Sequence, residues 1–191
     1  NNDLRGIASN GTYLVAVGQK TLGNPPKIYV TENCKQWSSR TTALALDHLN
    51  AVATDGSNWV AVGEDDGADA LIASSPDTVT WTERVNGKAF DLLGVTYDSV
   101  GLRWIAVGEA DGGDAYVVNS VDMITWTERV NPKNVQLNAV ASTSDLALEN
   151  VAVGNADGAD AYIITSGNAG NTWIERSNPK NFNLYGVAWS E

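Results

Sequence analysis

The sequence predicts an all-β fold made of repeated antiparallel units, and three observations support this prediction. A segment reading VAVG, or a close variant, begins at Val15, Val60, Ile105 and Val151, with spacings of 45, 45 and 46 residues. Each unit contains four short runs rich in Val, Ile, Tyr and Trp, separated by Gly, Asn, Asp and Ser, which is typical of strands joined by hairpins. No segment shows helical periodicity. Repeated four-stranded units of this length indicate four blades of a β-propeller.

The first strand of each unit is predicted to be the innermost strand of its blade. This strand begins at Leu4, Leu49, Leu92 and Leu137, and the same pattern starts a fifth time at Leu184. The third residue of the strand is always small: Gly6, Ala51, Gly94, Ala139 and Gly186. Innermost strands converge on the axis of a propeller, where side chains have the least room, so small residues are expected there.

The repeat divides a single domain, residues 1–191, into blades of about 4–48, 49–91, 92–136 and 137–183. In the second unit we expect strands at 49–54, 59–64, 70–74 and 80–85, with an Asp-Gly hairpin between the first two. A closing or surplus strand then follows at 184–190. Three alternatives remain open for this strand. It either completes the first blade while residues 1–9 are displaced, or belongs to a longer array, or pairs with a neighbouring subunit.

A Ser-x-Asp…Thr-Trp motif lies between the third and fourth runs. It comprises Ser75, Asp77 and Trp81 in the second unit, Ser120, Asp122 and Trp126 in the third, and Ser166, Asn168 and Trp173 in the fourth. It resembles the Asp-box of BNR-repeat, sialidase-like propellers, whose usual form is Ser-x-Asp-x-Gly-x-Thr-Trp. Thr31, Asn33 and Trp37 form a degenerate copy. The resemblance implies a structural hairpin in which the Asp caps backbone N–H groups and the Trp fills the layer between blades.

The resemblance does not imply sialidase activity. Sialidases use an arginine triad, an acid Asp and a Tyr–Glu pair. Here one arginine follows each Trp by three residues: Arg40, Arg84, Arg129 and Arg176. Arginines at equivalent positions of separate blades do not easily converge on one carboxylate. We therefore expect a non-enzymatic member of the family, because a shared fold does not carry function with it.

Repeated acidic loops provide the candidate ligand-binding residues. They are predicted to share one face with the Asn-x-Lys connections that lead to the next blade. The candidates are Asp65, Asp66, Asp69, Lys88, Asp111, Asp114, Lys133, Asp157, Asp160 and Lys180. Asp-Gly pairs favour tight hairpin turns, so we expect turns without a tightly held ion and no cofactor. Clustered carboxylates also suit calcium, which is the alternative.

The charge and hydropathy of the chain disfavour some classes of binding partner. The chain has 12 basic and 23 acidic residues and a net charge of −11, which disfavours nucleic acid and anionic membranes. No apolar run approaches the roughly 20 residues of a membrane span, so no membrane insertion is expected. Cys34 is the only cysteine, which excludes an internal disulfide.

The favoured function is a non-catalytic binding propeller that recognises glycans or a surface polymer, because similar weak sites gain strength from multivalency. The alternative is a structural or assembly module of a virion fibre or an extracellular appendage, with neighbouring protein subunits as partners. A sialidase-like glycoside hydrolase ranks third. Both leading hypotheses place the protein outside the cell or on a virion surface.

Overall fold

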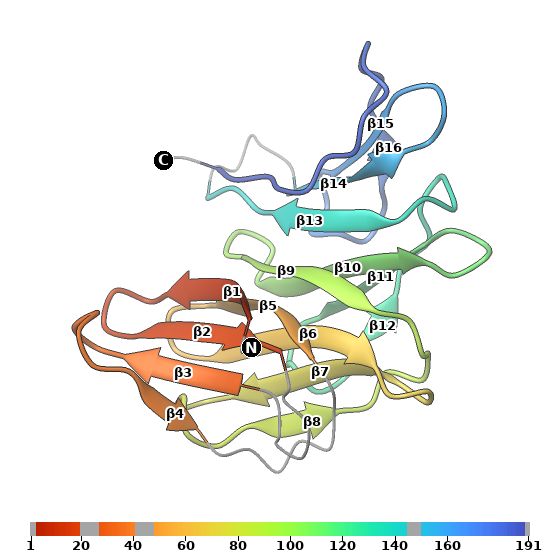
Figure 1. Ribbon diagram of the computed structural model, residues 1–191. Coiled ribbons are helices and arrows are strands. Elements are labelled where there is room, and N and C mark those ends of the chain that lie inside the picture. Colours follow the sequence, from red (N-terminus) through yellow and green to blue (C-terminus); the bar gives the residue numbers. More distant parts are fainter. Residues whose placement is uncertain (1–2, 20–26, 41–47, 145–149, 190–191) are drawn as a thin grey trace. The chain divides into compact units, whose positions relative to one another are not determined.

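A computed structural model describes residues 3–19, 27–40, 48–144 and 150–189. Its strands form four antiparallel sheets of four strands, and in each sheet the neighbouring strands are also consecutive in sequence (Figure 1). The prediction of an all-β chain with four four-stranded blades is confirmed. The described residues contain no helix long and apolar enough to cross a membrane.

The chain divides into two compact units, Asn1–Leu92 and Leu93–Glu191. In the first unit, blade 1 comprises β1 (Leu4–Ser9), β2 (Leu14–Gly18), β3 (Lys27–Thr31) and β4 (Ser38–Arg40). Blade 2 comprises β5 (Leu49–Thr54), β6 (Trp59–Asp65), β7 (Ala70–Ser75) and β8 (Thr82–Arg84). Blade 3, which starts at the boundary, comprises β9 (Leu92–Asp98), β10 (Arg103–Ala110), β11 (Ala115–Ser120) and β12 (Thr127–Glu128). Blade 4 comprises β13 (Leu137–Ala141), β14 (Asn150–Ala156), β15 (Ala161–Ser166) and β16 (Ile174–Glu175).

Small residues let the inner strands of successive blades approach closely. In the first unit, a Cβ atom built on Gly6 would lie 2.9 Å from the Cα of Ala51. In the second unit, a Cβ on Gly94 would lie 3.1 Å from the Cα of Ala139. The predicted reason for these small residues is therefore confirmed within each unit, since backbone meets backbone at this position.

The glycine that ends each VAVG segment has a separate role. A Cβ atom would lie 2.2 Å from the carbonyl oxygen of Asp3 at Gly18, 1.8 Å from that of His48 at Gly63, and 2.0 Å from that of Gln136 at Gly154. The residue after each glycine donates its backbone N–H to that same oxygen, at 2.8, 3.0 and 3.0 Å respectively. The pairing of β1 with β2, β5 with β6 and β13 with β14 shifts register beside these contacts. The glycine thus accommodates a β-bulge at the start of the inner strand.

The Trp motifs form the hairpins that the resemblance implies. In blade 2, Asp77 Oδ1 accepts the backbone N–H groups of Val79 at 2.9 Å and Thr80 at 2.7 Å, and Ser75 Oγ lies 3.2 Å away. Asp122 repeats these bonds in blade 3, and Asn168 accepts the Thr172 N–H in blade 4. Bonds from backbone N–H groups lower the pKa of Asp77, and they lower that of Asp122 to about 2.

The hydrophobic core of each unit lies between its two blades. We call the side of a blade that meets the next blade its forward face, and the opposite side its rear face. In the first unit, Val15, Val17, Ile28 and Val30 on the forward face of blade 1 pack against the rear face of blade 2. That rear face includes Leu49, Val52, Trp59 and Trp81. The second unit repeats this packing between blades 3 and 4, where Trp173 takes the place of Trp81.

The expected surplus strand requires a correction. Residues 184–189 adopt no regular strand, and Ser190 lies outside the described residues. The segment is held at its start, because Leu184 N donates to Gly154 O at 2.9 Å and Asn138 Nδ2 donates to Leu184 O at 2.8 Å. A strand requires a partner strand, and no described strand pairs with this segment.

Candidate functional site

The first Asp of each acidic loop closes a tight turn with its own side chain. Asp66 Oδ1 accepts the backbone N–H groups of Ala68 at 2.8 Å and Asp69 at 2.9 Å. Asp111 and Asp157 make the same pair of bonds in blades 3 and 4. The glycine that follows each of them has positive φ, between 91° and 99°. The prediction that the Asp-Gly pairs serve hairpin turns is confirmed.

The second Asp of each loop reaches the connection to the next blade. Asp69 Oδ1 accepts the backbone N–H groups of Asn86 and Gly87. Asp114 accepts the N–H of Asn131 at 2.8 Å, and Asp160 accepts that of Asn178 at 3.2 Å. Asp65 completes the loop of blade 2, because its carboxylate accepts the Gly67 N–H at 2.8 Å. The structure thus brings each acidic loop together with its connection, as the sequence predicted.

The Asn-x-Lys connections clamp the start of the third strand. Asn86 Nδ2 donates to Ala70 O at 2.6 Å, and Ala70 N donates to Lys88 O at 2.7 Å. The same two bonds join Asn131 and Lys133 to Ala115, and Asn178 and Lys180 to Ala161. Sequence reasoning placed these asparagines on the connections but did not assign them this structural role. Their signal was present in the threefold recurrence of Asn two residues before Lys.

Lys133 is the centre of a charged cluster in the second unit. Its amino group donates to Asp157 Oδ2 and to Glu175 Oε1. These bonds raise the pKa of Lys133 above its usual range, with Asp157 as the larger cause. The bond from Lys133, followed by those from the Asp160 and Ala159 N–H groups, lowers the pKa of Asp157.

A buried tyrosine makes hydrogen bonds to the connection that carries Lys133. The Tyr162 hydroxyl donates to Asn131 Oδ1 at 2.9 Å and accepts the Lys133 backbone N–H at 3.1 Å. Tyr162 is fully buried, and this burial raises the pKa of its phenol. The hydroxyl therefore acts as a fixed hydrogen-bonding group that anchors the connection ahead of blade 4.

We expect Lys133→Met to lower the melting temperature by a few degrees near neutral pH. The Asp157 contribution is present above its unfolded pKa, about 3.9, and is lost as pH falls through its lowered folded value. The Lys133 contribution is present below about pH 10.4 and is lost as pH rises through its raised folded value. The difference between wild type and variant should therefore be constant from about pH 4 to 10 and shrink outside that window.

Thermal unfolding followed across this pH range measures the difference. Lys180→Met is the matched control, because Lys180 ends the equivalent connection and its side chain is exposed. An equal loss in both variants, or a loss that persists in strong acid, would contradict the assignment.

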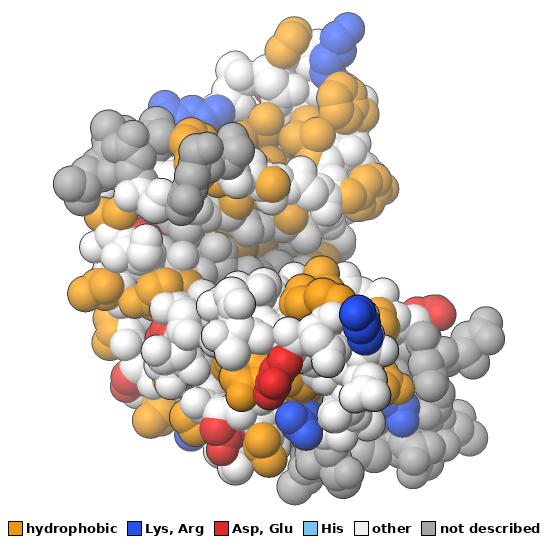
Figure 2. Space-filling view, turned by 90° about the vertical axis from the view of Figure 1, so that its left-hand side faces the viewer, with side chains coloured by type: hydrophobic (Ala, Val, Ile, Leu, Met, Phe, Trp, Pro, Cys, Tyr) orange, Lys and Arg blue, Asp and Glu red, His pale blue; other side chains and the backbone are white. Residues whose placement is uncertain are grey.

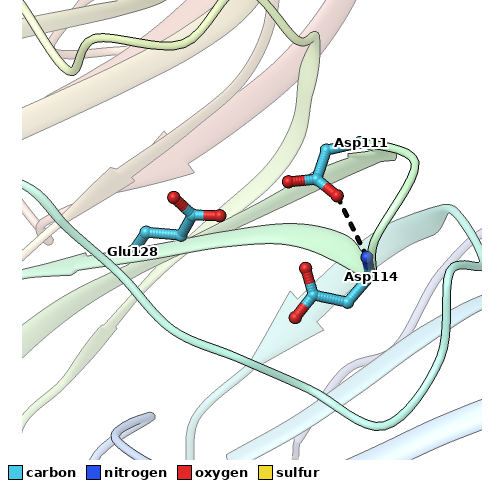
Figure 3. Close-up of side chains that lie close together, drawn as sticks. All are labelled: Asp111, Asp114 and Glu128. Carbon is cyan, nitrogen blue, oxygen red and sulfur yellow. Dashed lines mark hydrogen bonds between the residues drawn. The ribbon is translucent and has the colours of Figure 1, made fainter.

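Among the described residues, two groups of carboxylates have the spacing of a cation site, and Figure 3 shows the one in blade 3. One comprises Asp111, Asp114 and Glu128, and the other Asp157, Asp160 and Glu175; the oxygens of each group lie within 4.8 Å of one another. In Figure 3, Asp111 also accepts the Asp114 N–H, so one of its oxygens already serves the turn. In blade 4 the Lys133 amino group occupies the position next to Asp157 and Glu175.

We expect calcium to leave the melting temperature unchanged, since backbone N–H groups and Lys133 already engage these carboxylates. A protein that binds an ion only when folded would instead melt at a higher temperature as the ion concentration rises. Thermal unfolding in excess calcium and in chelator is the measurement. A rise of several degrees that the double variant Asp66→Asn, Asp111→Asn abolishes would establish the calcium alternative.

The repeated arginines are anchored separately, each through its Nε atom. Arg84 donates to Ser74 Oγ at 2.8 Å in blade 2. Arg129 donates to Asn119 Oδ1 at 3.0 Å in blade 3, and Arg176 donates to Thr165 Oγ1 at 2.8 Å in blade 4. Each of these three joins the fourth strand, or the residues just after it, to the third strand of its own blade. Arg40 differs, because its Nε donates to Thr78 O of blade 2 at 3.2 Å.

No protein-family profile and no curated protein sequence matches the chain. Solved structures match over nearly its full length. A chain of a nidogen/laminin complex matches with TM-score 0.63 and 12% identity, over 93% of this chain and 66% of its own. The computationally designed Ika8 protein matches with TM-score 0.64 and 14% identity, over 98% and 53%. Trypanosoma rangeli sialidase in complex with sialic acid matches with TM-score 0.57 and 14% identity, over 92% and 37%.

A GH130 structure, from a family of mannoside phosphorylases with glycoside hydrolases that target β-1,2-mannosidic linkages in Candida mannan, also matches. Its TM-score is 0.54 and its identity 10%, over 96% of this chain and 72% of its own. Identities this low show the fold alone. This chain spans about half to three quarters of the matching chains of the nidogen/laminin complex, Ika8 and the GH130 structure, and a smaller part of the sialidase. The chain therefore has a four-bladed propeller fold similar to that of sialidases and GH130 glycosidases.

Proposed function

We propose that this protein is a non-catalytic glycan-binding propeller that uses the face formed by its acidic loops and Asn-x-Lys connections. The observation that carries the proposal is an exposed aromatic side chain on this face. Phe182, two residues after Lys180, is 51% exposed. The next residue, Asn183, accepts the backbone N–H of Ala156 in the acidic loop of blade 4, at 2.9 Å. Phe182 thus directly precedes a residue that is held against the acidic loop of blade 4.

This combination suits a sugar ring. Aromatic rings offer an apolar surface to the C–H face of a pyranose, and carboxylates and amides accept and donate the hydrogen bonds of its hydroxyl groups. Figure 2 displays the side at the left of Figure 1, where hydrophobic side chains are interspersed with charged ones; the acidic loops between β6 and β7 and between β10 and β11 lie at the right of Figure 1. Several matching structures are glycosidases or sialidases, which supports a sugar-related role for this fold. A protein of net charge −11 repels anions, so we propose neutral glycans as ligands.

The absence of catalysis is part of the proposal. It is supported by the separate anchoring of Arg84, Arg129 and Arg176 described above. It is also supported by the loop carboxylates, since Asp66, Asp111 and Asp157 each accept two backbone N–H groups within their own turn. A role in binding glycans at a cell surface or in an extracellular polymer follows from this proposal.

An array of neutral and acidic glycans tests the proposal, followed by titration of the best ligand. We expect neutral glycans to bind and Phe182→Ala to weaken binding about tenfold, which is 1.4 kcal/mol. Ile174→Ala is the matched control, because Ile174 is 58% exposed but follows the box tryptophan rather than a connection. An array without ligands, or an equal loss in both variants, would contradict the binding site. Release of free sugar from a bound glycan would contradict the non-catalytic role.

A further inference from the structure

The Asn-x-Lys connection after blade 2 contains a reactive group that the other two connections lack. Its middle residue is Gly87, whereas the middle residue is Pro132 after blade 3 and Pro179 after blade 4. Glycine has a backbone N–H group and proline has none. A backbone nitrogen that carries a proton can attack the side-chain carbonyl carbon of a preceding asparagine, and glycine adds no side chain to hinder the attack. Of the three connections, that after blade 2 alone has this nucleophile.

A carboxylate meets this nitrogen. Asp69 Oδ1 accepts the Gly87 N–H and, at 3.2 Å, the Asn86 N–H. In blades 3 and 4, Asp114 and Asp160 accept the N–H of the asparagine of their own connection, and the proline that follows offers no N–H. A carboxylate that already accepts the Gly87 N–H is placed to remove the proton as the nitrogen attacks, which is the role of a general base.

The side chain of Asn86 is held at both of its polar atoms. Its Oδ1 accepts the Lys88 backbone N–H at 3.3 Å, and its Nδ2 donates to Ala70 O at 2.6 Å. The Oδ1 atom gains negative charge when a nitrogen adds to the side-chain carbonyl, so an N–H group directed at it stabilises that state. All of these residues belong to the first unit, and they lie within one acidic loop and its connection.

We propose that Asn86 and Gly87 form a self-modification site, at which the Asn86 side chain cyclises and is converted to aspartate or isoaspartate. The Gly87 nitrogen forms a bond to Cγ of Asn86 while Asp69 takes its proton. The bond from Cγ to Nδ2 then breaks, and the amide nitrogen leaves as ammonia with that proton. A water molecule hydrolyses the remaining succinimide ring at either carbonyl, which gives the two products without any oxidant or reductant.

The product loosens the connection of blade 2. An aspartate at position 86 has no amide N–H to donate, so the carbonyl oxygen of Ala70, a residue that is 1% exposed, loses this bond. The new carboxylate also lies in the connection that Asp69 binds, so two like charges come close. We expect the aged protein to melt a few degrees below fresh protein. The change accumulates with the age of the molecule, and the connections of blades 3 and 4 escape it.

The sequence contains one other Asn-Gly pair, Asn10-Gly11, which serves as an internal control. The Gly11 N–H donates to Ser9 Oγ at 3.1 Å. A hydroxyl accepts a proton far less readily than a carboxylate, so this pair lacks an effective base. In the folded protein we expect Asn86 to react at least about tenfold faster than Asn10. In concentrated urea both pairs lose their surroundings, and we expect the two rates to become similar.

Incubation of the folded 191-residue chain near neutral pH, followed by mass analysis of its peptides, measures both rates. Heavy-oxygen water marks each converted residue, because hydrolysis of the ring adds one oxygen atom from the solvent. Asp69→Asn should slow the conversion of Asn86 at least about tenfold, since the amide keeps an oxygen for the hydrogen bonds but is not a base. Asn86→Gln should abolish the fall in melting temperature during incubation, because its longer side chain does not form the five-membered ring.

Asp77→Asn is the matched control for Asp69→Asn. It removes one carboxylate from the same blade, and the equivalent residue of blade 4 is already Asn168. We expect it to leave the rate at Asn86 unchanged, and circular dichroism confirms that each variant folds. A rate at Asn86 no higher than that at Asn10 in the folded protein would overturn the proposal. Undiminished conversion in Asp69→Asn, or equal slowing by Asp77→Asn, would overturn it as well.

Discussion

Replacing Trp81 with Ala should lower the free energy of unfolding by about 3–5 kcal/mol. Trp81 is 6% exposed and packs in the core between blades 1 and 2. Its indole Nε1 donates to Thr78 O at 3.2 Å, within the same hairpin. The substitution removes a large apolar side chain, opens a cavity between two blades and leaves a carbonyl with one bond fewer. Urea denaturation at constant m-value measures the loss.

Trp37→Ala is the matched control for this prediction. Trp37 occupies the same position of the motif in blade 1 but is 42% exposed, so its removal should cost roughly 1 kcal/mol or less. The comparison holds the residue type and its position in the motif constant and varies the burial of the indole. Equal losses in the two variants would show that the tryptophan acts through its own hairpin and not through packing between blades.

Replacing Gly154 with Ala should destabilise the protein by about 3 kcal/mol or more, or prevent folding of the second unit. The new Cβ atom would lie 2.0 Å from the carbonyl oxygen of Gln136, which is backbone and has no rotamer to change. That oxygen also accepts the Asn155 N–H at 3.0 Å, so moving it breaks a bond of the β-bulge. The inner strand β13 would have to shift as a whole.

Gly186→Ala serves as the control for the second variant, because nothing lies within 4 Å of a Cβ atom at Gly186. We expect its melting temperature to stay within about a degree of wild type, since surface substitutions change stability by less than about 0.5 kcal/mol. Thermal and urea unfolding of both variants provide the test. If Gly154→Ala were equally harmless, the close approach at the VAVG glycines would not be required for the fold.

The repeat in the sequence predicted the blades because the residues of each unit specify the strands and turns of that unit locally. The Asp-Gly pair at Asp66 specifies a turn through side-chain bonds to the backbone of the second and third residues after Asp66, and these bonds need no tertiary partner. The same holds for the hairpin around Asp77. Local hydrogen bonding of this kind is readable from a single sequence.

The candidate site was only partly predictable. Sequence reasoning placed the acidic loops and the Lys-bearing connections on one face, and the structure joins them through Asp69, Asp114 and Asp160. It missed the role of Glu175, which meets Lys133 across 42 residues of sequence. It also missed Tyr162, whose hydroxyl bonds Asn131 across 31 residues. Contacts over such separations depend on how one blade lies against the next, and no local pattern encodes that.

By itself, the sequence determined the all-β class, the four units and the chemistry of their turns, because these depend on residues that are close along the chain. The tertiary structure alone decided which copies of a motif are buried. Trp37 and Trp81 occupy the same position of the repeat, yet they are 42% and 6% exposed. Leu184 starts the same pattern as Leu49, yet no strand follows it. The physical reason is the same in both cases. Burial and strand pairing depend on which element packs beside a segment, and the sequence of the segment does not specify that neighbour.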